Sequence, residues 1–245
     1  MKQVFYTVKS NEKIARDIYK MVLEGDTSAI TAPGQFINLK LDGFYLRRPI
    51  SVYDYDGESV TIIYKTVGTG TYAMAEMQAG EVIDTLTGLG NGFDTQKSGD
   101  APLLVGGGVG VPPMYNLAKK LIAEGKAVSV ILGFNSSPDV FGEEEFKALG
   151  AKVYVATADG SYGTKGFVTD VMKTLDYSFF YTCGPEPMFR AIDKIAQTSG
   201  QYSFEERMGC GFGACMGCSC KTLTGNKRIC KEGPVLMREE IIWKD

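Results

Sequence analysis

Residues 205–220 read EERMGCGFGACMGCSC, and a short polar run then leads to the string RIC, which ends at Cys230. Cys210, Cys215 and Cys218 stand in C-x4-C-x2-C spacing, the ligand spacing of plant-type [2Fe–2S] proteins. Glycines alternate with these cysteines, and glycine lets a loop wrap closely around a cluster and aim backbone N–H groups at its sulfurs. The stretch therefore predicts an iron–sulfur site with Cys210, Cys215, Cys218 and Cys230 as ligands.

Three other interpretations of these cysteines stay open from the spacing alone. Zinc sites usually take two C-x2-C-like pairs, which a four-residue gap does not resemble. A disulfide framework needs an oxidising compartment, of which the sequence carries no sign. The cysteines also fit a set of unrelated thiols, and Cys220 is predicted to be a buried spare thiol.

Length and composition indicate a globular chain of one or two domains. The 245 residues are 44% hydrophobic and 22% charged, which is ordinary for a soluble protein. A formal net charge of −3 argues against a nucleic acid partner. Because no secretory signal and no bilayer-length apolar run is visible, we expect a cytoplasmic protein with reduced cysteines.

The sequence contains no histidine. This excludes a Rieske-type cluster on this chain, His-ligated metals, and Ser-His-Asp or Cys-His catalysis. Electron transfer through bound cofactors remains open.

The pattern of elements divides the chain into parts of different class. Short β-prone runs bounded by turn residues predict an antiparallel barrel or sandwich over residues 1–96, with one helix over 72–77. From residue 100 to 200, continuous apolar strands alternate with helices, which indicates βαβ units on a parallel sheet. Residues 203–245 form the cysteine-rich segment, and the polar run 95–100 is interpreted as a linker.

Glycine-rich turns follow several strands of the predicted parallel sheet. The string VGGGVGVPP joins the strand 103–105 to a helix over 112–123, so that a phosphate could approach backbone N–H groups there. It departs from G-x-G-x-x-G, because Val111 stands where the third glycine would be. The turns at 157–163 and 182–188 lie at the same sheet edge, where ligands of open α/β sheets bind. Each turn alone also fits a plain connection.

Two strings in the first domain suit an anionic ligand. Arg47 and Arg48 precede Pro49, Ile50 and Ser51 between two β-runs, and paired cations can bind a diphosphate. The string VGTGT over residues 67–71 is a second candidate phosphate seat. Taken singly, an exposed basic turn remains the simpler interpretation of the arginine pair.

Together these strings resemble the ferredoxin reductase-like flavoprotein superfamily, in which an FAD-binding β-barrel precedes an NAD(P)-binding α/β domain. The resemblance implies that Arg48 contacts the FAD pyrophosphate and that Ser51 lies near flavin N5. It assigns FAD contacts to Arg48, Pro49, Ile50, Ser51, Ile63, Tyr64, Lys65, Gly70 and Thr71. It assigns nicotinamide-nucleotide contacts to Gly106, Gly107, Gly108, Gly110, Asp159, Gly160, Cys183, Gly184 and Pro185. Ser51 and Cys183 are the implied catalytic residues.

More closely, the chain is similar to electron-transfer subunits of NAD-dependent (type B) dihydroorotate dehydrogenase. The strings that carry this similarity are PGQF at 33–36, RPIS at 48–51, GGVGVPP at 107–113 and ERMGCGFGACMGC at 206–218. The four candidate ligand cysteines fall on the four ligands of that family. The resemblance covers essentially the whole chain.

The resemblance implies a relay for pyrimidine biosynthesis. A partner subunit that holds FMN oxidises dihydroorotate, and electrons pass singly through the cluster to FAD, which delivers a hydride to NAD+. Because a cluster carries one electron and nicotinamide accepts two, a flavin must stand between them. The family also implies a heterotetramer with two copies of each subunit.

NAD is favoured over NADP, because no Arg or Lys follows the second parallel strand, where a 2′-phosphate usually finds a cation. Asp139 there fits either a ribose contact or a solvated turn. A stand-alone or differently partnered NAD(P)H-ferredoxin or flavin reductase is the alternative enzyme. A nucleotide-sensing binding protein with a structural zinc tail is the alternative from another class.

Overall fold

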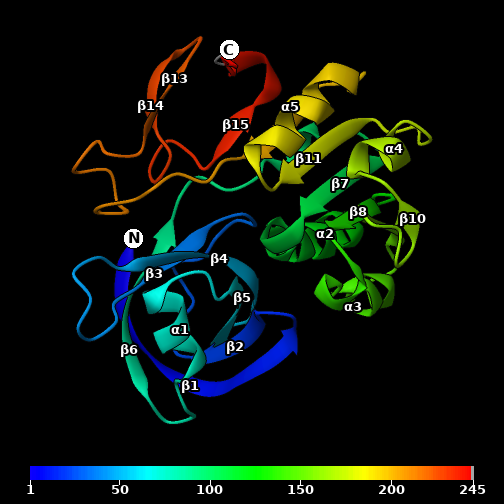
Figure 1. The fold of residues 1–245 in the computed structure, drawn as a ribbon. Coiled ribbons are helices and arrows are strands. Elements are labelled where there is room, and N and C mark those ends of the chain that lie inside the picture. Colours follow the sequence, from blue (N-terminus) through cyan, green and yellow to red (C-terminus); the bar gives the residue numbers. More distant parts are fainter. Residues whose placement is uncertain (244–245) are drawn as a thin grey trace.

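The structure is a computed structural model and describes residues 1–243. A β-barrel, a parallel α/β sheet and a cysteine-bearing lobe follow one another along the chain, and the lobe lies above the barrel and beside the sheet (Figure 1). The last two residues of the predicted segment 203–245 lie outside the described part. The predicted domain boundaries themselves stay predictions.

The first part is a closed antiparallel barrel with the order β1-β2-β5-β4-β3-β6. Its interior is filled by the inward side chains of alternating strand positions, such as Ile37, Leu39 and Ile62. The strands are β1 (Lys2–Ala15), β2 (Ile18–Glu24), β3 (Phe36–Leu39), β4 (Arg48–Tyr55), β5 (Ser59–Lys65) and β6 (Val82–Leu89).

Two details of the barrel differ from the sequence-based expectation. Arg48–Ser51 was expected between strands, but these residues begin strand β4. The helix α1 was expected over 72–77, but it spans Thr69–Ala75. It begins earlier because Thr71 Oγ1 accepts hydrogen bonds from the backbone N–H groups of Val67 and Gly68, which caps the first turn.

The second part is a sheet in the order β10-β9-β8-β7-β11-β12-β15. Strands β7 to β12 pair in parallel, which confirms the parallel pairing predicted for β7, β8, β9 and β11, whereas β10 and β12 were not predicted. The strands are β7 (Pro102–Gly107), β8 (Ser129–Phe134), β9 (Lys152–Thr157), β10 (Thr164–Lys165), β11 (Phe179–Cys183) and β12 (Gly200–Ser203). The helices are α2 (Pro112–Ala123), α3 (Glu143–Ala148), α4 (Val168–Met172) and α5 (Glu186–Ile195).

The cysteine-bearing lobe is tied into this sheet, which nothing in the sequence predicted. Its hairpin consists of β13 (Ser219–Thr222) and β14 (Gly225–Arg228), and β15 (Val235–Met237) then pairs antiparallel with β12. The lobe is therefore joined through β15 to β12, the strand that pairs with β11.

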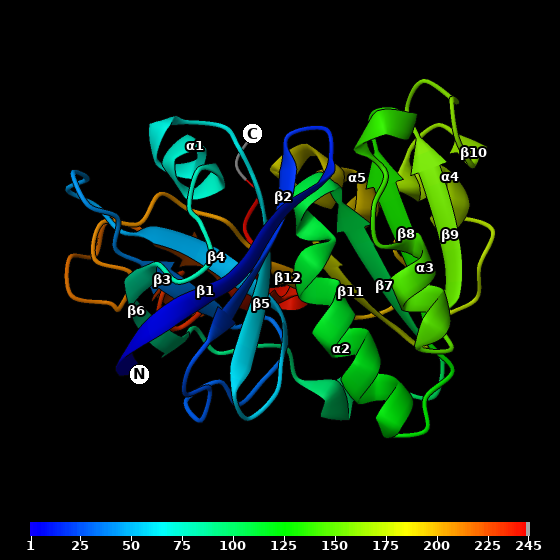
Figure 2. The same cartoon turned by 90° about the horizontal axis from the view of Figure 1, so that it is seen from below.

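Helix α2 lies between the barrel and the sheet (Figure 2). The Tyr53 and Tyr115 rings stack with centroids 4.3 Å apart. Asp54 of β4 accepts hydrogen bonds from Asn116 and Lys119, both at 2.9 Å. These contacts fix the barrel against helix α2 of the second part. Across residues 1–243, no helix is long and apolar enough to cross a membrane.

Candidate functional site

A cavity of about 600 Å³ lies between the barrel and the carboxyl ends of β7, β8 and β11. This is the edge at which open α/β sheets bind ligands. Residues from both parts line it. They include Arg16, Ile18 and Lys65 from the barrel and Gly107–Gly110, Asn135, Asp139, Phe167, Gly184, Pro185, Met188 and Glu205 from the rest of the chain.

The glycine-rich turn after β7 packs directly on the end of β11. A Cβ built on Gly110 would lie 2.1 Å from the carbonyl oxygen of Cys183, so only glycine fits there. Gly108 adopts φ +54°, a conformation that glycine takes without strain. A Cβ on Gly107 would meet Met188 Sδ at 2.6 Å. The turn thus presents bare backbone to the cavity, as a bound diphosphate requires.

Cys183 is buried at this junction, with 2% of its surface exposed. Burial raises the pKa of its thiol far above the usual range, and the nearby Glu205 carboxylate adds to the rise. The thiol is therefore neutral at physiological pH and is no nucleophile. Any part that Cys183 takes in hydride transfer must come from packing or from its S–H group.

Glu205 is a cavity residue that sequence reasoning missed. It follows β12 and shares the cavity wall with Gly184 and Pro185. Desolvation by the neighbouring protein raises the pKa of its carboxyl group, although part of the residue is exposed. Its position before the cysteine string was visible in the sequence, but nothing local marked it as a neighbour of Cys183.

The structure brings two of the predicted FAD strings together. A Cβ built on Gly70 would lie 2.1 Å from Arg48 Nε, so the guanidinium reaches the start of α1. Arg48 also stacks on the Phe44 ring, 4.9 Å from its centroid. A cation beside glycine backbone at a helix start fits a diphosphate such as that of FAD. Ser51 stands three positions further along the same strand, opposite Phe36 of β3.

The third predicted FAD string, on β5, divides its side chains between two environments. Lys65 lines the cavity. Tyr64 instead lies inside the barrel and donates a hydrogen bond to Asn11 at 2.9 Å. Ile63 packs in the apolar cluster between barrel and sheet.

Asp159 and Gly160 do not line the cavity. Asp159 accepts hydrogen bonds from the backbone and side chain of Ser161, which hold the turn after β9. The structure therefore places them in a turn beside the cavity rather than on its wall.

The candidate ligand cysteines form two pairs. The backbone N–H groups of Ala214 and Cys215 point at Cys210 Sγ, at 3.2 and 3.4 Å, and that of Cys230 points at Cys218 Sγ at 3.5 Å. Although partial burial opposes it, these backbone N–H groups lower the pKa of the Cys210 thiol to about 6. Thiolates next to backbone donors are the ligand environment of an iron–sulfur cluster.

The donor set is four cysteine thiols, in the ligand spacing of a plant-type [2Fe–2S] cluster. A structural zinc site usually takes two C-x2-C-like pairs, which the four-residue gap between Cys210 and Cys215 does not match. Cys220 packs in the apolar cluster behind Cys218 and Cys230, as expected for a spare thiol.

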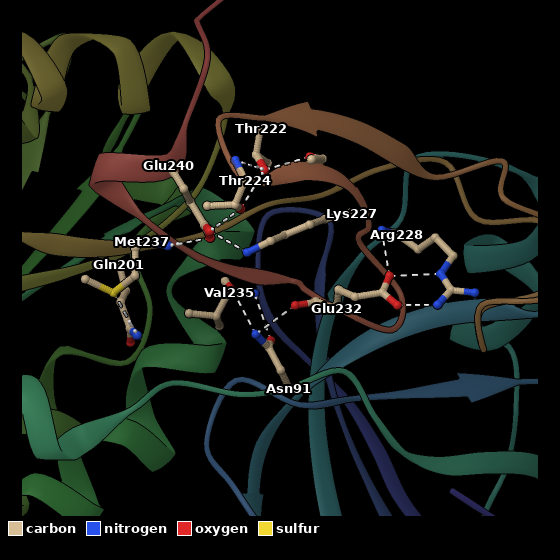
Figure 3. Close-up of polar contacts among 11 residues, drawn as sticks. Asn91, Gln201, Thr222, Thr224, Lys227, Arg228, Glu232, Val235, Met237 and Glu240 are labelled. Carbon is tan, nitrogen blue, oxygen red and sulfur yellow. Dashed lines mark hydrogen bonds and ion pairs between the residues drawn. The ribbon is translucent and has the colours of Figure 1, made fainter.

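Polar contacts of Arg228, Glu232 and Asn91 hold the segment that carries Cys230 (Figure 3). Arg228 Nη1 donates to the Gly213 carbonyl at 2.6 Å, and its Nε donates to Glu232 at 2.9 Å. The Arg228–Glu232 ion pair thus brackets Cys230 and ties it to the cysteine loop. Asn91, from the segment after β6, donates to the carbonyl of Val235 at 2.8 Å and anchors the lobe to the barrel side.

Asn38 is a second residue that sequence reasoning missed. It lies on β3 opposite Pro49, and its Nδ2 donates to the Cys210 carbonyl at 3.3 Å. The side chain is 1% exposed, and its Oδ1 has no hydrogen-bond partner among residues 1–243. Asn38 therefore links the cysteine loop to the strand pair that carries the arginine–serine string.

Comparison with known protein families agrees with this arrangement. Residues 205–242 match the family described as "Iron-sulfur cluster binding domain of dihydroorotate dehydrogenase B", and residues 104–194 match "Oxidoreductase NAD-binding domain". Fold and site together define an NAD-linked iron–sulfur flavoprotein oxidoreductase.

Curated relatives identify the particular family. A protein of Bacillus pumilus (strain SAFR-032) is 46% identical over 98% of this chain and 98% of its own length, and one of Fusobacterium nucleatum is 45% identical over 96% of each. Both are named "Dihydroorotate dehydrogenase B (NAD(+)), electron transfer subunit". The chain belongs to this family of electron transfer subunits.

Two solved structures share the fold over most of the chain. An NADH-dependent reduced ferredoxin-NADP oxidoreductase, solved in work on flavin-based electron bifurcation, is 28% identical, has a TM-score of 0.87, and covers 97% of this chain and 90% of its own. A ferredoxin NADP+ reductase of Neisseria gonorrhoeae is 16% identical with a TM-score of 0.70, covering 83% of this chain and all of its own, and shows the likeness of fold alone.

Proposed function

We propose that this chain carries electrons from an FMN-containing, dihydroorotate-oxidising partner subunit through a [2Fe–2S] cluster and FAD to NAD+, in the cytoplasm. Cys210, Cys215, Cys218 and Cys230 hold the cluster. Arg48 and the start of α1 hold the FAD diphosphate, and the cavity with Gly107–Gly110 holds NAD. The family to which the chain belongs supports the overall reaction.

The observation that carries the proposal is the continuity of the three sites. Cys218 and Cys230 pack in one apolar cluster with Phe36 of β3. Phe36 faces Ser51 across the β3–β4 ladder. Lys65, on the neighbouring strand, already lines the nucleotide cavity. Bound FAD would supply the two-electron chemistry that a one-electron cluster lacks, and these contacts support a flavin position between cluster and nucleotide.

Exposed apolar side chains surround the cysteine loop and support a partner contact there. Phe212 and Met216 of the loop are 42% and 54% exposed. Tyr45, fully exposed, and Leu46 belong to the β3–β4 connection, and this connection lies on the same side of the molecule as the segment that leads into β13 (Figures 1 and 2). Apolar groups left on a surface in this way are typical of protein interfaces. A partner docked there would bring its electron donor close to the cluster.

A visible spectrum of the anaerobically purified chain, with iron and zinc assayed on the same sample, tests the cofactors. We expect flavin bands over a broad iron–sulfur envelope and about two irons per chain. A colourless protein that carries zinc would instead support a nucleotide-binding module.

Co-purification from the native source tests the partner. We expect an FMN protein that reduces the cluster with dihydroorotate, in a heterotetramer with two copies of each subunit. A coloured chain that reduces ferredoxin with NADH or NADPH and never associates with an FMN protein would establish the alternative reductase.

A further inference from the structure

Arg16, which the sequence did not single out, lies in the turn between β1 and β2. Its backbone N–H donates to the Pro138 carbonyl at 3.0 Å, in the connection between β8 and α3. On its other side, the Asp17 carbonyl accepts a hydrogen bond from the Thr66 backbone at 2.9 Å. The barrel turn is thereby fixed against the nucleotide-binding sheet, with its arginine at the cavity wall.

The Arg16 guanidinium forms hydrogen bonds with both carboxylate oxygens of Asp139. Its Nε donates to Oδ1 at 2.9 Å and its Nη2 donates to Oδ2 at 2.7 Å. Oδ2 also accepts from the backbone and hydroxyl of Ser136. Among the described residues, Oδ1 accepts from Arg16 alone, which leaves it a lone pair for another donor. Asp139 is thus a held carboxylate, 15% exposed, and not a solvated turn residue.

The pair stands at the carboxyl end of β8, the second strand of the parallel run. In nucleotide sites of this architecture an acid there binds the ribose 2′-OH, and a cation binds a 2′-phosphate. No cation follows β8 in the sequence, yet the fold brings one from the barrel. A guanidinium from the barrel and a carboxylate from the α/β part therefore meet at this position.

We propose that Arg16 and Asp139 act as one specificity element for the adenosine ribose, an inference that rests on the proposed NAD site. Asp139 accepts the ribose 2′-OH through the free lone pair of Oδ1. Arg16 holds the carboxylate in that orientation and is itself neutralised, so it offers no free charge to a 2′-phosphate. A 2′-phosphate would also face the Asp139 carboxylate, a like charge at close range.

The pair makes an asymmetric prediction for two substitutions. Asp139→Asn removes the carboxylate and releases a cation into the cavity. We expect kcat/KM for NADPH to rise by about 10- to 100-fold, the range for a gained charge-assisted hydrogen bond, and that for NADH to fall by about tenfold. Arg16→Gln should weaken NADH use without any gain of NADPH, because no cation remains.

The deciding experiment is a double-mutant cycle on the flavin-loaded chain. Reduction of the flavin by NADH and NADPH is measured together with calorimetric binding of 5′-AMP and adenosine 2′,5′-bisphosphate. In the Arg16→Gln/Asp139→Asn double variant, we expect the NADPH gain and the tighter binding of the bisphosphate to disappear. Persistence of both gains without Arg16, or an unchanged NADH/NADPH ratio in Asp139→Asn, would overturn the proposal.

Two controls separate this outcome from others. Asp54→Asn breaks another ion pair between barrel and sheet, with Lys119, away from the cavity lining. It should leave the NADH/NADPH preference unchanged. A changed preference in this variant would mean that a weaker contact between the barrel and the α/β part, and not the contact with the ribose, alters the preference. If neither nucleotide reduces the wild-type flavin, the proposed function fails, and the specificity element fails with it.

Discussion

Replacing Gly110 with alanine tests whether the glycine-rich turn must touch the end of β11. The new Cβ would lie 2.1 Å from the Cys183 carbonyl oxygen and 2.6 Å from the Gly184 nitrogen, and an ordinary contact begins near 3.4 Å. The two backbones must therefore move apart by about 1.3 Å. Cys183 ends the hydrogen-bonded strand β11, and Gly110 lies in a short turn that the Val111 N–H closes on the Gly108 carbonyl, so neither backbone yields in the way a flexible side chain would.

The expected cost follows from this displacement. Overpacking of this kind destabilises a protein by about 1–3 kcal/mol. A misplacement of about 1 Å at a reacting centre lowers rates by roughly 10²-fold. We expect flavin reduction by NADH to slow by about that factor, while FAD and iron contents stay at wild-type levels, since the turn contacts neither Arg48 nor the cysteine loop.

Anaerobic stopped-flow mixing with NADH, followed at the flavin band, measures the effect. Gly57→Ala is the matched control, because nothing lies within 4 Å of its added Cβ and its backbone is outside the left-handed region. Wild-type reduction rates and NADH affinity in Gly110→Ala would refute the close approach as a requirement for nucleotide binding.

Three further substitutions test the remaining sites. Cys215→Ala should abolish the cluster and leave FAD bound, and full iron retention would contradict the ligand assignment. Cys183→Ala should slow NADH–flavin exchange by about tenfold with cofactor content intact, whereas unchanged kinetics would rule out a role in hydride transfer. Arg228→Gln should speed loss of iron to a chelator, since it loses its bonds to Gly213 and Glu232; chelation at the wild-type rate would show that this tie does not hold the loop.

Local patterns in the sequence were enough to predict the four strands β7, β8, β9 and β11 of the α/β sheet and the helices that follow them, but not the short strands β10, β12 and β15. The four predicted strands are largely buried and read as continuous apolar runs, and a proline opens α2 where no backbone donor is needed. The cysteine spacing predicted the metal site for the same reason, since the ligands lie close together along the chain. The structure confirms the parallel sheet and the barrel before it.

Residues that act over long sequence separations were missed. Arg16 reaches Asp139 across 123 positions, and Asn38 reaches Cys210 across 172. Neither residue differs locally from an ordinary turn or strand residue. Strand β15 was missed because three residues carry no periodicity. The whole cysteine string also separates it in the sequence from its partner β12.

The misplacement of Arg48–Ser51 has a physical cause that bears on function. Pro49 argues against a strand, because proline donates no ladder hydrogen bond. In the barrel, β4 pairs with β3 over residues 48–51 but with β5 only from Val52 onward. The first half of β4 thus has one open edge, where a proline is tolerated.

Folded proteins usually cover an unpaired strand edge, because its free N–H and C=O groups could otherwise pair with another chain. This edge carries Arg48 and Ser51, and it lies between the apolar cluster of Cys218 and the cavity wall at Lys65. A planar cofactor bound along it would cover the edge and stand between the cysteines and the nucleotide. We therefore expect the break in pairing that hid this strand from sequence reasoning to be the place where the flavin binds.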